Sequence, residues 1–246
     1  MNNVFAFHGV DHKVGTTQIA QCVAELLSKK YPDSSVLLIQ GDGGRGSEYC
    51  NHVNESIERI RPFLAQSVIN TEEIKLKSLY KDNLYIIGGQ DKPEFSEYLT
   101  PDMAEILIAA VKEVFDFVII DTGSQIEDSF ALGAVLSTDR LYFIINQRES
   151  TLRNYEFYSY LYERIDVVPD LIIINCFNKR SLYEKDYIEE RLMIDESKIL
   201  TIRESKQGAK AEINGKSIVS LKPEKAFIND LEEIIKDIVE HARIGI

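Results

Sequence analysis

The sequence has few cysteines and no long apolar run. Cys22, Cys50 and Cys176 are its three cysteines, and their wide spacing supports neither a disulfide framework nor a zinc site. We expect Cys22 and Cys176, which lie in apolar segments, to be buried thiols in a reducing compartment. The first apolar run, residues 4–7, is too short for a signal peptide, and no run approaches the roughly 20 apolar residues that span a bilayer. These absences predict a cytoplasmic protein.

Basic residues are also scarce. The 246 residues include 28 Lys and Arg against 40 Asp and Glu, which gives a formal net charge of −12. Non-specific nucleic-acid binding depends mainly on cationic side chains that neutralise phosphates. The charge balance therefore argues against a nucleic-acid partner. With 44% hydrophobic residues, the chain has enough apolar side chains to form a core without disulfides or metals.

Short apolar runs predict buried strands along the chain. They lie at residues 4–7, 35–39, 83–88, 115–121, 140–146, 170–175 and 198–202. Most are apolar on both faces, as in parallel strands covered by helices on two sides. Helical patterns alternate with them, notably at residues 19–27, 101–111, 154–165 and 225–242. The alternation predicts an α/β fold with one doubly wound, mostly parallel sheet and helices on both faces, in a single domain over residues 1–246.

A short loop separates the first predicted strand from the first predicted helix, within "FAFHGVDHKVGTTQIAQCVAELL" (residues 5–27). A strand, a glycine-bearing loop, a threonine pair and a helix form the arrangement that holds nucleotide phosphates. In open α/β sheets, ligands bind beyond the carboxyl ends of the strands. The loops that follow Ile39, Ile120 and Ile174 reach that same edge, so we expect the four loops to form one crevice.

Five segments resemble, in the same order, the ParA/MinD group of P-loop ATPases, and most closely its TadZ/CpaE branch of pilus-localisation proteins. They are "VGTTQIAQCVAELL", "VLLIQGDGGRGS", "PEFSEYLTPDMAEILIAAVKEVFDFVIIDTGS", "IIINCFNK" and "GKSIVSLKPEKAFINDLEEI". The resemblance covers nearly the whole chain. It implies a P-loop NTPase-like fold, ATP or ADP with Mg²⁺ as the ligand, a homodimer, and protein partners.

The resemblance also implies site residues. Gly15, Thr16 and Thr17 match the positions that hold the phosphates, and Asn175 matches the residue that contacts the adenine. Thr17 and Asp121 match the two oxygen donors on the magnesium side. These assignments depend on the resemblance and not on spacing alone.

The phosphate loop departs from the family pattern Lys-Gly-Gly-Val-Gly-Lys-Thr-Thr. Residues 11–18 read "DHKVGTTQ", so both lysines and two of the glycines are missing. Thr16 stands where a lysine holds the terminal phosphates, and Asp11 stands where the other lysine reaches across the dimer. A charge-assisted hydrogen bond is worth about 1.5–3 kcal/mol, so we expect triphosphate binding to be weaker by about one to two powers of ten.

Hydrolysis should suffer more than binding, because cations that meet the charge developing on the phosphoryl group are worth roughly 10³–10⁵ in rate. Lys13 is a candidate substitute cation, with a solvated loop lysine as the alternative. Gln40 replaces the first carboxylate of the family's Asp-x-Asp pair and cannot act as a general base. Asp42 keeps the second carboxylate, unless its flanking glycines only form a turn. Lys13 and Asp42 are the remaining catalytic candidates.

Two polar residues at strand ends, Asp121 and Asn175, each have two possible roles, and two histidines have no assigned role. Asp121 ends a buried strand, where its carboxylate either binds magnesium or braces the loop. Asn175 either contacts a base or satisfies the backbone at a strand end. His8 and His12 have no companion nucleophile or acid in register, so we do not expect them to be catalytic.

One predicted helix is rich in aromatic residues. Tyr155, Tyr158 and Tyr162 fall on one face and should pack against the sheet, whereas Phe157, Tyr160 and Leu161 point elsewhere. A helix that is apolar on more than one side either forms a protein interface or is deeply buried.

The sequence leaves three functional hypotheses. The first is a localisation or assembly scaffold for a pilus or secretion-type machine, with weak or absent ATP hydrolysis. The second is an ATP-dependent dimerisation switch with slow hydrolysis, and the third, disfavoured by the acidic charge, is a DNA-partition ATPase. The helix over residues 225–242 is acidic on its polar side, so we expect recruitment to a membrane machine through proteins and no direct membrane insertion.

Overall fold

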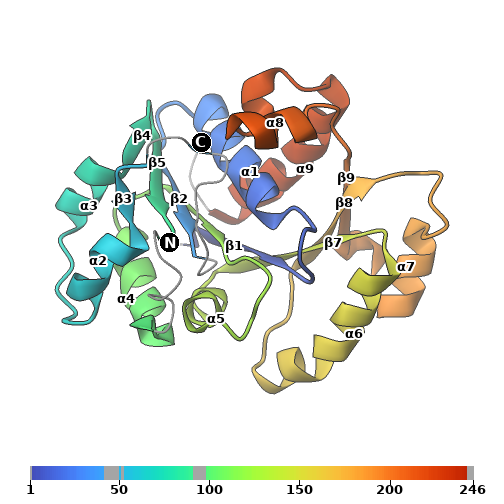
Figure 1. Ribbon diagram of the computed structural model, residues 1–246, viewed down its shortest axis with the longest axis horizontal. Helices are drawn as coiled ribbons and strands as arrows, with labels where there is room; N and C mark the ends of the chain where they lie inside the picture. The colour runs from blue at the N-terminus through green and yellow to red at the C-terminus, as the bar shows by residue number, and fades with distance from the viewer. Residues whose placement is uncertain (1, 42–49, 51–52, 91–97, 243–246) are drawn as a thin grey trace.

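The computed structural model describes residues 2–41, 50, 53–90 and 98–242, and its sheet lies between two layers of helices (Figure 1). Within these residues one nine-stranded sheet has the order β3-β5-β2-β6-β1-β7-β8-β9, with β4 paired to β5. The strands are β1 (Val4–Gly9), β2 (Val36–Gln40), β3 (Glu55–Ser56), β4 (Leu79–Lys81), β5 (Leu84–Gly88), β6 (Phe117–Asp121), β7 (Arg140–Asn146), β8 (Leu171–Phe177) and β9 (Ile199–Arg203). All pair in parallel except β4 with β5. The predicted doubly wound α/β fold is confirmed.

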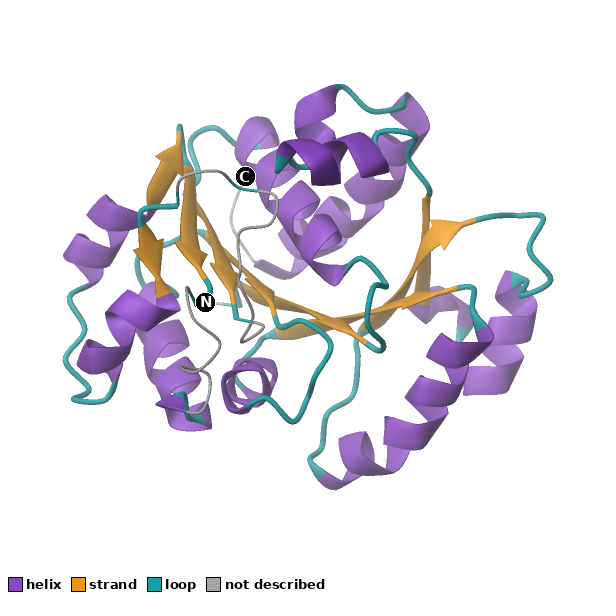
Figure 2. Ribbon diagram, in the orientation of Figure 1, coloured by secondary structure: helices purple, strands orange, loops and turns teal. Residues whose placement is uncertain are grey.

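Helices cover both faces of the sheet (Figure 2). They are α1 (Thr16–Lys30), α2 (Ile57–Leu64), α3 (Thr71–Ser78), α4 (Pro101–Val111), α5 (Ser129–Leu136), α6 (Glu149–Arg164), α7 (Lys185–Leu192), α8 (Gly208–Asn214) and α9 (Lys225–Ala242), with short 3₁₀ helices η2 (Glu196–Lys198) and η3 (Ile218–Leu221). One apolar core joins the sheet to α1, α8, η3 and α9, and the other joins it to α2 through α7. No helix in the described part of the chain is both long and apolar enough to cross a membrane.

The central strand β1 shows why the fold forms. Val4 and Ala6 belong to one core and Phe5 and Phe7 to the other, because side chains alternate across a strand. All four are buried. Burying a phenylalanine fully contributes about 1.5–3 kcal/mol, so β1 anchors both helical layers.

The last helix is joined to β7 by a largely buried ionic cluster. Arg140 donates to both carboxylate oxygens of Asp237, at 2.5 and 2.7 Å, and the Tyr142 hydroxyl donates to the same carboxylate at 2.6 Å. Burial and the neighbouring Asp237 carboxylate raise the pKa of Tyr142 well above its ordinary value. Tyr142 therefore stays a neutral donor, and the cluster fixes α9 over the sheet.

Two structural features differ from the sequence-based expectations. The edge strands β3 and β4 had no predicted counterpart, because one has two residues and the other is antiparallel and partly exposed. Cys176 is exposed, so its predicted burial is wrong. The register of β8 shifts after Ile174, and Cys176 adopts a φ of 52°, which turns it out of the core. Cys22 is buried as expected, and burial raises the pKa of its thiol to about 11.

Candidate functional site

The loop between β1 and α1 lies at the carboxyl edge of the sheet, against the loop that follows β6 (Figure 1). The Gly9 N–H donates to the Gly123 carbonyl at 2.7 Å, and the Val10 N–H donates to the Ile144 carbonyl at 3.0 Å. A cavity of about 660 Å³ opens beside the loop. It is lined by Asp11, His12, Lys13, Gly15, Thr16, Thr17, Gln18, Gly123, Ser124, Gln125 and Glu212. Lys13, Gly15, Thr16 and Thr17 therefore line one cavity, and their roles toward a nucleotide stay predictions.

The loop backbone keeps a tight, partly left-handed conformation. Gly15 has a φ of 93°, and a Cβ at that position would lie 2.3 Å from Nδ2 of Asn175. Lys13 also has a positive φ, 60°, although it carries a side chain. A left-handed conformation costs a residue other than glycine roughly 1–2 kcal/mol. The surrounding contacts hold the loop in this shape despite that cost.

Two asparagines from distant elements supply those contacts. Asn154 of α6 donates from Nδ2 to the Val10 carbonyl at 2.5 Å, and Asn175 of β8 donates to the Val14 carbonyl at 2.8 Å. The Asn175 Oδ1 accepts from the Cys176 N–H at 2.8 Å, so both ends of the buried amide bond the backbone. These contacts match the backbone interpretation of Asn175. Contact with an adenine stays a prediction.

Thr16 occupies the lysine position of the family pattern without replacing its charge. Its side chain is buried and turned back onto β1: a Cβ on Gly9 would lie 2.3 Å from the Thr16 Oγ1. This close approach explains why a glycine ends β1. A hydroxyl packed in this way cannot supply the ammonium group that grips a terminal phosphate.

The first turn of α1 still offers hydrogen-bond donors. The helix begins at Thr16 with Gly15 as its N-cap, and its first intrahelical bond runs from the Ile19 N–H to the Gly15 carbonyl. The N–H groups of Thr16, Thr17 and Gln18 precede that bond and have no partner within the helix. With the helix dipole, they favour an anion at this end of the cavity.

Asp121 lies deeper in the protein than the phosphate loop. It is 1% exposed at the end of β6, in register with Gln40 of β2 and Phe7 of β1. Its Oδ1 accepts from the Gly123 N–H at 3.1 Å, which matches the bracing interpretation. The Thr17 hydroxyl and the Asp121 carboxylate are donors of the type that Mg²⁺ prefers, and a metal role for them stays a prediction. The other predicted acid, Asp42, lies outside the described residues.

Carboxylates surround the loop. Asp11 and Glu212 line the cavity, where Lys13 is the one lysine or arginine among the described lining residues. A neighbouring cavity of about 440 Å³ shares Asp11 and adds Glu127 and Asp128. A triphosphate entering here would meet like charge, which weakens its binding.

His8 lies in the core. It is fully buried, its Nδ1 lies 3.0 Å from the Thr122 Oγ1, and the Thr122 hydroxyl donates to the Phe7 carbonyl. Burial lowers the pKa of His8 to about 4, so the ring is neutral at physiological pH. His12 is exposed, with its Nδ1 3.0 Å from the Ser124 Oγ. Each histidine therefore lies within hydrogen-bond distance of a hydroxyl group, so the expectation that neither has a companion hydroxyl is wrong.

Sequence reasoning missed Gly9, Ser124, Asn154 and Glu212 as residues of this site. They contact or line the phosphate loop from four separate elements. No local pattern identifies Ser124, Asn154 or Glu212, because each reaches the loop from an element more than a hundred residues away in the sequence. Gly9 carried the one available signal, a glycine at the end of the strand that enters the loop.

Solved structures share the architecture of the whole chain. A ParA family ATPase from Chlorobium tepidum superposes with a TM-score of 0.83 at 18% identity, over 95% of this chain and 98% of that one. The chain has the ParA/MinD fold. The septum site-determining protein MinD from Pyrococcus horikoshii, complexed with Mg-ADP, has a TM-score of 0.75 at 20% identity, over 99% and 100% of the two chains. MinD from the Aquifex aeolicus MinC:MinD complex has a TM-score of 0.72 at 17% identity, over 95% and 96%.

Comparisons at the sequence level give no match. No family model matches the chain, and no curated protein matches it significantly. The likeness to ParA and MinD is therefore one of fold, and the activity of this chain has to be argued from its own residues.

Proposed function

We propose that this ParA/MinD-fold protein is a localisation or assembly scaffold for a pilus or secretion-type machine, and that it hydrolyses ATP weakly or not at all. It would act in the cytoplasm, as a homodimer or with other proteins, and reach a membrane machine through protein contacts. The placement of Thr16 carries the proposal. The chain keeps the strand, loop and helix that form a phosphate site in P-loop proteins, but Thr16 stands where a lysine would stabilise the phosphoryl group during transfer.

Lys13 does not stand at the position of either missing lysine. Lys13 lines the cavity, but it lies three residues before Thr16, on the far side of the left-handed turn at Gly15. Asp11 and Glu212 flank the same space. Each lost charge-assisted contact weakens triphosphate binding by about 1.5–3 kcal/mol.

The outer face of α6 supports a role in protein contacts. Phe157 is 75% exposed and Tyr160 is 66% exposed, so deep burial, one of the two interpretations of this helix, is wrong for them. The Arg164 guanidinium carbon lies 5.7 Å from the centre of the Tyr160 ring. Tyrosine, phenylalanine and arginine are enriched in protein interfaces. Tyr155, Tyr158 and Tyr162 pack against the core, as predicted, and so does Leu161, for which the expectation was wrong.

The second candidate function is an ATP-dependent dimerisation switch. The N–H groups of the first turn of α1, the Thr17 hydroxyl and the Asp121 carboxylate favour it, and so does the Mg-ADP bound by P. horikoshii MinD. In this case Gly15, Thr16 and Thr17 would hold the phosphates, and Thr17 and Asp121 would face the magnesium ion. A DNA-partition role is third, because the chain carries a net charge of −12.

Two measurements separate the candidates. Isothermal titration with ATP and Mg²⁺ measures binding, and a continuous phosphate-release assay measures turnover. If the protein is a scaffold, we expect weak ATP binding and a rate of phosphate release that is the same in the wild type and in Thr17→Ala. Tight binding with steady release that Thr17→Ala abolishes would support the switch. A salt-dependent shift of random duplex DNA would support the partition role.

A further inference from the structure

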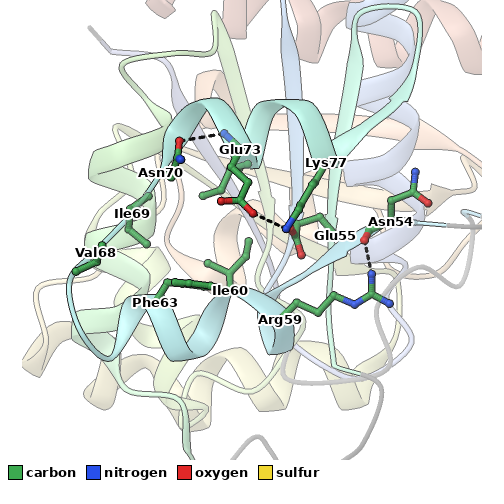
Figure 3. Close-up of a pocket in the computed structure, with 11 residues that line it drawn as sticks. Asn54, Glu55, Arg59, Ile60, Phe63, Val68, Ile69, Asn70, Glu73 and Lys77 are labelled. Atoms are coloured by element: carbon green, nitrogen blue, oxygen red, sulfur yellow. Dashed lines mark hydrogen bonds and ion pairs between the residues drawn. The ribbon is translucent and has the colours of Figure 1, made fainter.

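A second cavity lies at the edge of the sheet, between α2 and α3 (Figure 3). It has a volume of about 470 Å³, within the roughly 300–1,000 Å³ range of small-molecule pockets. It borders β3, which is four strands away from β1 in the sheet, or about 19 Å at 4.8 Å per strand. It is therefore separate from the phosphate loop.

One half of this cavity is apolar. Phe63, Val68 and Ile69 line it at the loop between the two helices, next to the buried Ile60 (Figure 3). The buried Ile74 of α3 also lines it. Phe63 is 52% exposed and Val68 is 63% exposed. A ligand that covers this apolar surface gains about 25 cal/mol of favourable binding free energy for each Å² removed from water.

The other half is charged and includes a buried carboxylate. Glu55 is 5% exposed, and its Oε1 accepts a hydrogen bond from the adjacent Ser56 N–H at 3.0 Å. No ion pair within 4.0 Å joins Glu55 to a described lysine or arginine. Lys77 lines the same half of the cavity and is paired with Glu73 at 2.5 Å, and the carboxylates of Glu73 and, to a smaller extent, Glu55 raise the pKa of Lys77. The Arg59 guanidinium donates to the Asn54 carbonyl at the rim. A carboxylate this buried is costly unless a cation or further donors reach it.

We propose that this cavity binds a small amphipathic amine: a primary ammonium group on an apolar body of the size of a hexyl or phenylethyl group. The ammonium group occupies the charged half and donates to Glu55. The apolar body covers Phe63 and Val68. A carboxylate of the same size binds more weakly, because Glu55 repels it, the Lys77 ammonium group is paired with Glu73, and the Arg59 guanidinium donates to the Asn54 carbonyl at the rim.

The test uses hexylamine, phenethylamine, hexanol and hexanoate as probes of the full-length chain. Binding is measured by titration with ¹H–¹⁵N NMR, which also locates the perturbed amides. We expect the amines to shift resonances of α2, α3 and their connecting loop, and to bind at least about tenfold more tightly than hexanoate, the effect of one charge-assisted hydrogen bond.

Three variants separate the two halves of the site. Glu55→Gln should weaken amine binding about tenfold and leave hexanol binding unchanged, because the amide keeps the shape but not the charge. Val68→Ser should weaken both amine and hexanol binding. Leu76→Ser is the matched control: Leu76 is 78% exposed on α3 and does not line the cavity, so both affinities should stay unchanged. Melting temperatures confirm that each variant is folded.

Three results would overturn the proposal. They are the absence of amine-induced shifts in α2 and α3, hexanoate binding as tight as hexylamine binding, and unchanged amine affinity in folded Glu55→Gln. A further probe, N-acetyl-lysine amide, represents the lysine side chain of a peptide. Weaker binding of this probe than of hexylamine supports a free amphipathic amine as the ligand, and tighter binding is a further result that contradicts the proposal. The outcome is independent of ATP binding at the phosphate loop.

Discussion

Restoring the missing ammonium group is the sharpest test of the phosphate loop. Thr16→Lys places a long cationic side chain at the first residue of α1, where the cavity of about 660 Å³ leaves room for it. A charge-assisted hydrogen bond contributes about 1.5–3 kcal/mol, which corresponds to a factor of about 10–150 in affinity. We therefore expect Thr16→Lys to bind ATP·Mg²⁺ at least about tenfold more tightly than the wild type.

The matched control is Thr16→Met, which has a similar length and no charge. Both variants lose the packing of the threonine side chain on Gly9, so their melting temperatures should fall together. Affinity is measured by isothermal titration with ATP and by displacement of a fluorescent ATP analogue. Steady hydrolysis should stay low in Thr16→Lys, because Asp11 still stands where the family's other lysine reaches across the dimer. Adding Asp11→Lys should raise it.

Two results would refute this reasoning. If the wild type binds ATP·Mg²⁺ as tightly as Thr16→Lys, another group already supplies the cation. If Thr16→Met gains as much affinity as Thr16→Lys, the effect comes from side-chain length and not from charge.

Three further predictions concern stability, measured by urea unfolding. Lys13→Gly should stabilise the protein by about 0.5–1 kcal/mol, because glycine relieves the left-handed strain at the cost of a more flexible unfolded chain. Asp237→Asn should cost about 2 kcal/mol by leaving the Arg140 guanidinium partly unpaired, whereas Glu232→Gln, which loses a more exposed ion pair with Lys30, should cost less than about 1 kcal/mol. Burial lowers the pKa of His8 from 6.5 in the unfolded chain to about 4 in the folded protein, so the unfolded state binds a proton first and stability falls as the pH drops below 6.5. A change from pH 7 to pH 5 should therefore lower the free energy of unfolding by about 2 kcal/mol through His8. This loss should be absent in His8→Gln.

The central strands could be predicted from the sequence because their signal is local. The runs around Phe7, Ile39 and Ile120 are apolar on both faces, and only a parallel sheet between two helical layers buries both faces at once. Helix α3 could not be predicted in the same way, because Ile74 and Leu76 are two residues apart, which is not a helical spacing, and Leu76 is exposed. Helix α2 does carry a local signal, the buried Ile57, Ile60 and Leu64 at helical spacing, which the sequence analysis did not use.

The loop between β1 and α1 was located from the sequence, but its geometry was not. How the loop closes against β1 decides two features: the left-handed conformation of Lys13 and the packing of the Thr16 side chain against Gly9. The anchors Asn154 and Asn175 come from more than a hundred residues away. Such long-range contacts leave no trace in local hydrophobic periodicity or in turn residues.

The strand order has a consequence for synthesis of the chain. β1 emerges before the other strands, yet its neighbours are β6 and β7, and α1 is covered by α9, which ends at Ala242. At about 5–20 residues per second, the nascent chain carries the apolar side chains of β1 and α1 uncovered for roughly 10–50 s. A ribosome-bound fragment that stops before α9 should therefore recruit chaperones or aggregate, whereas one extended past Ala242 should resist proteolysis.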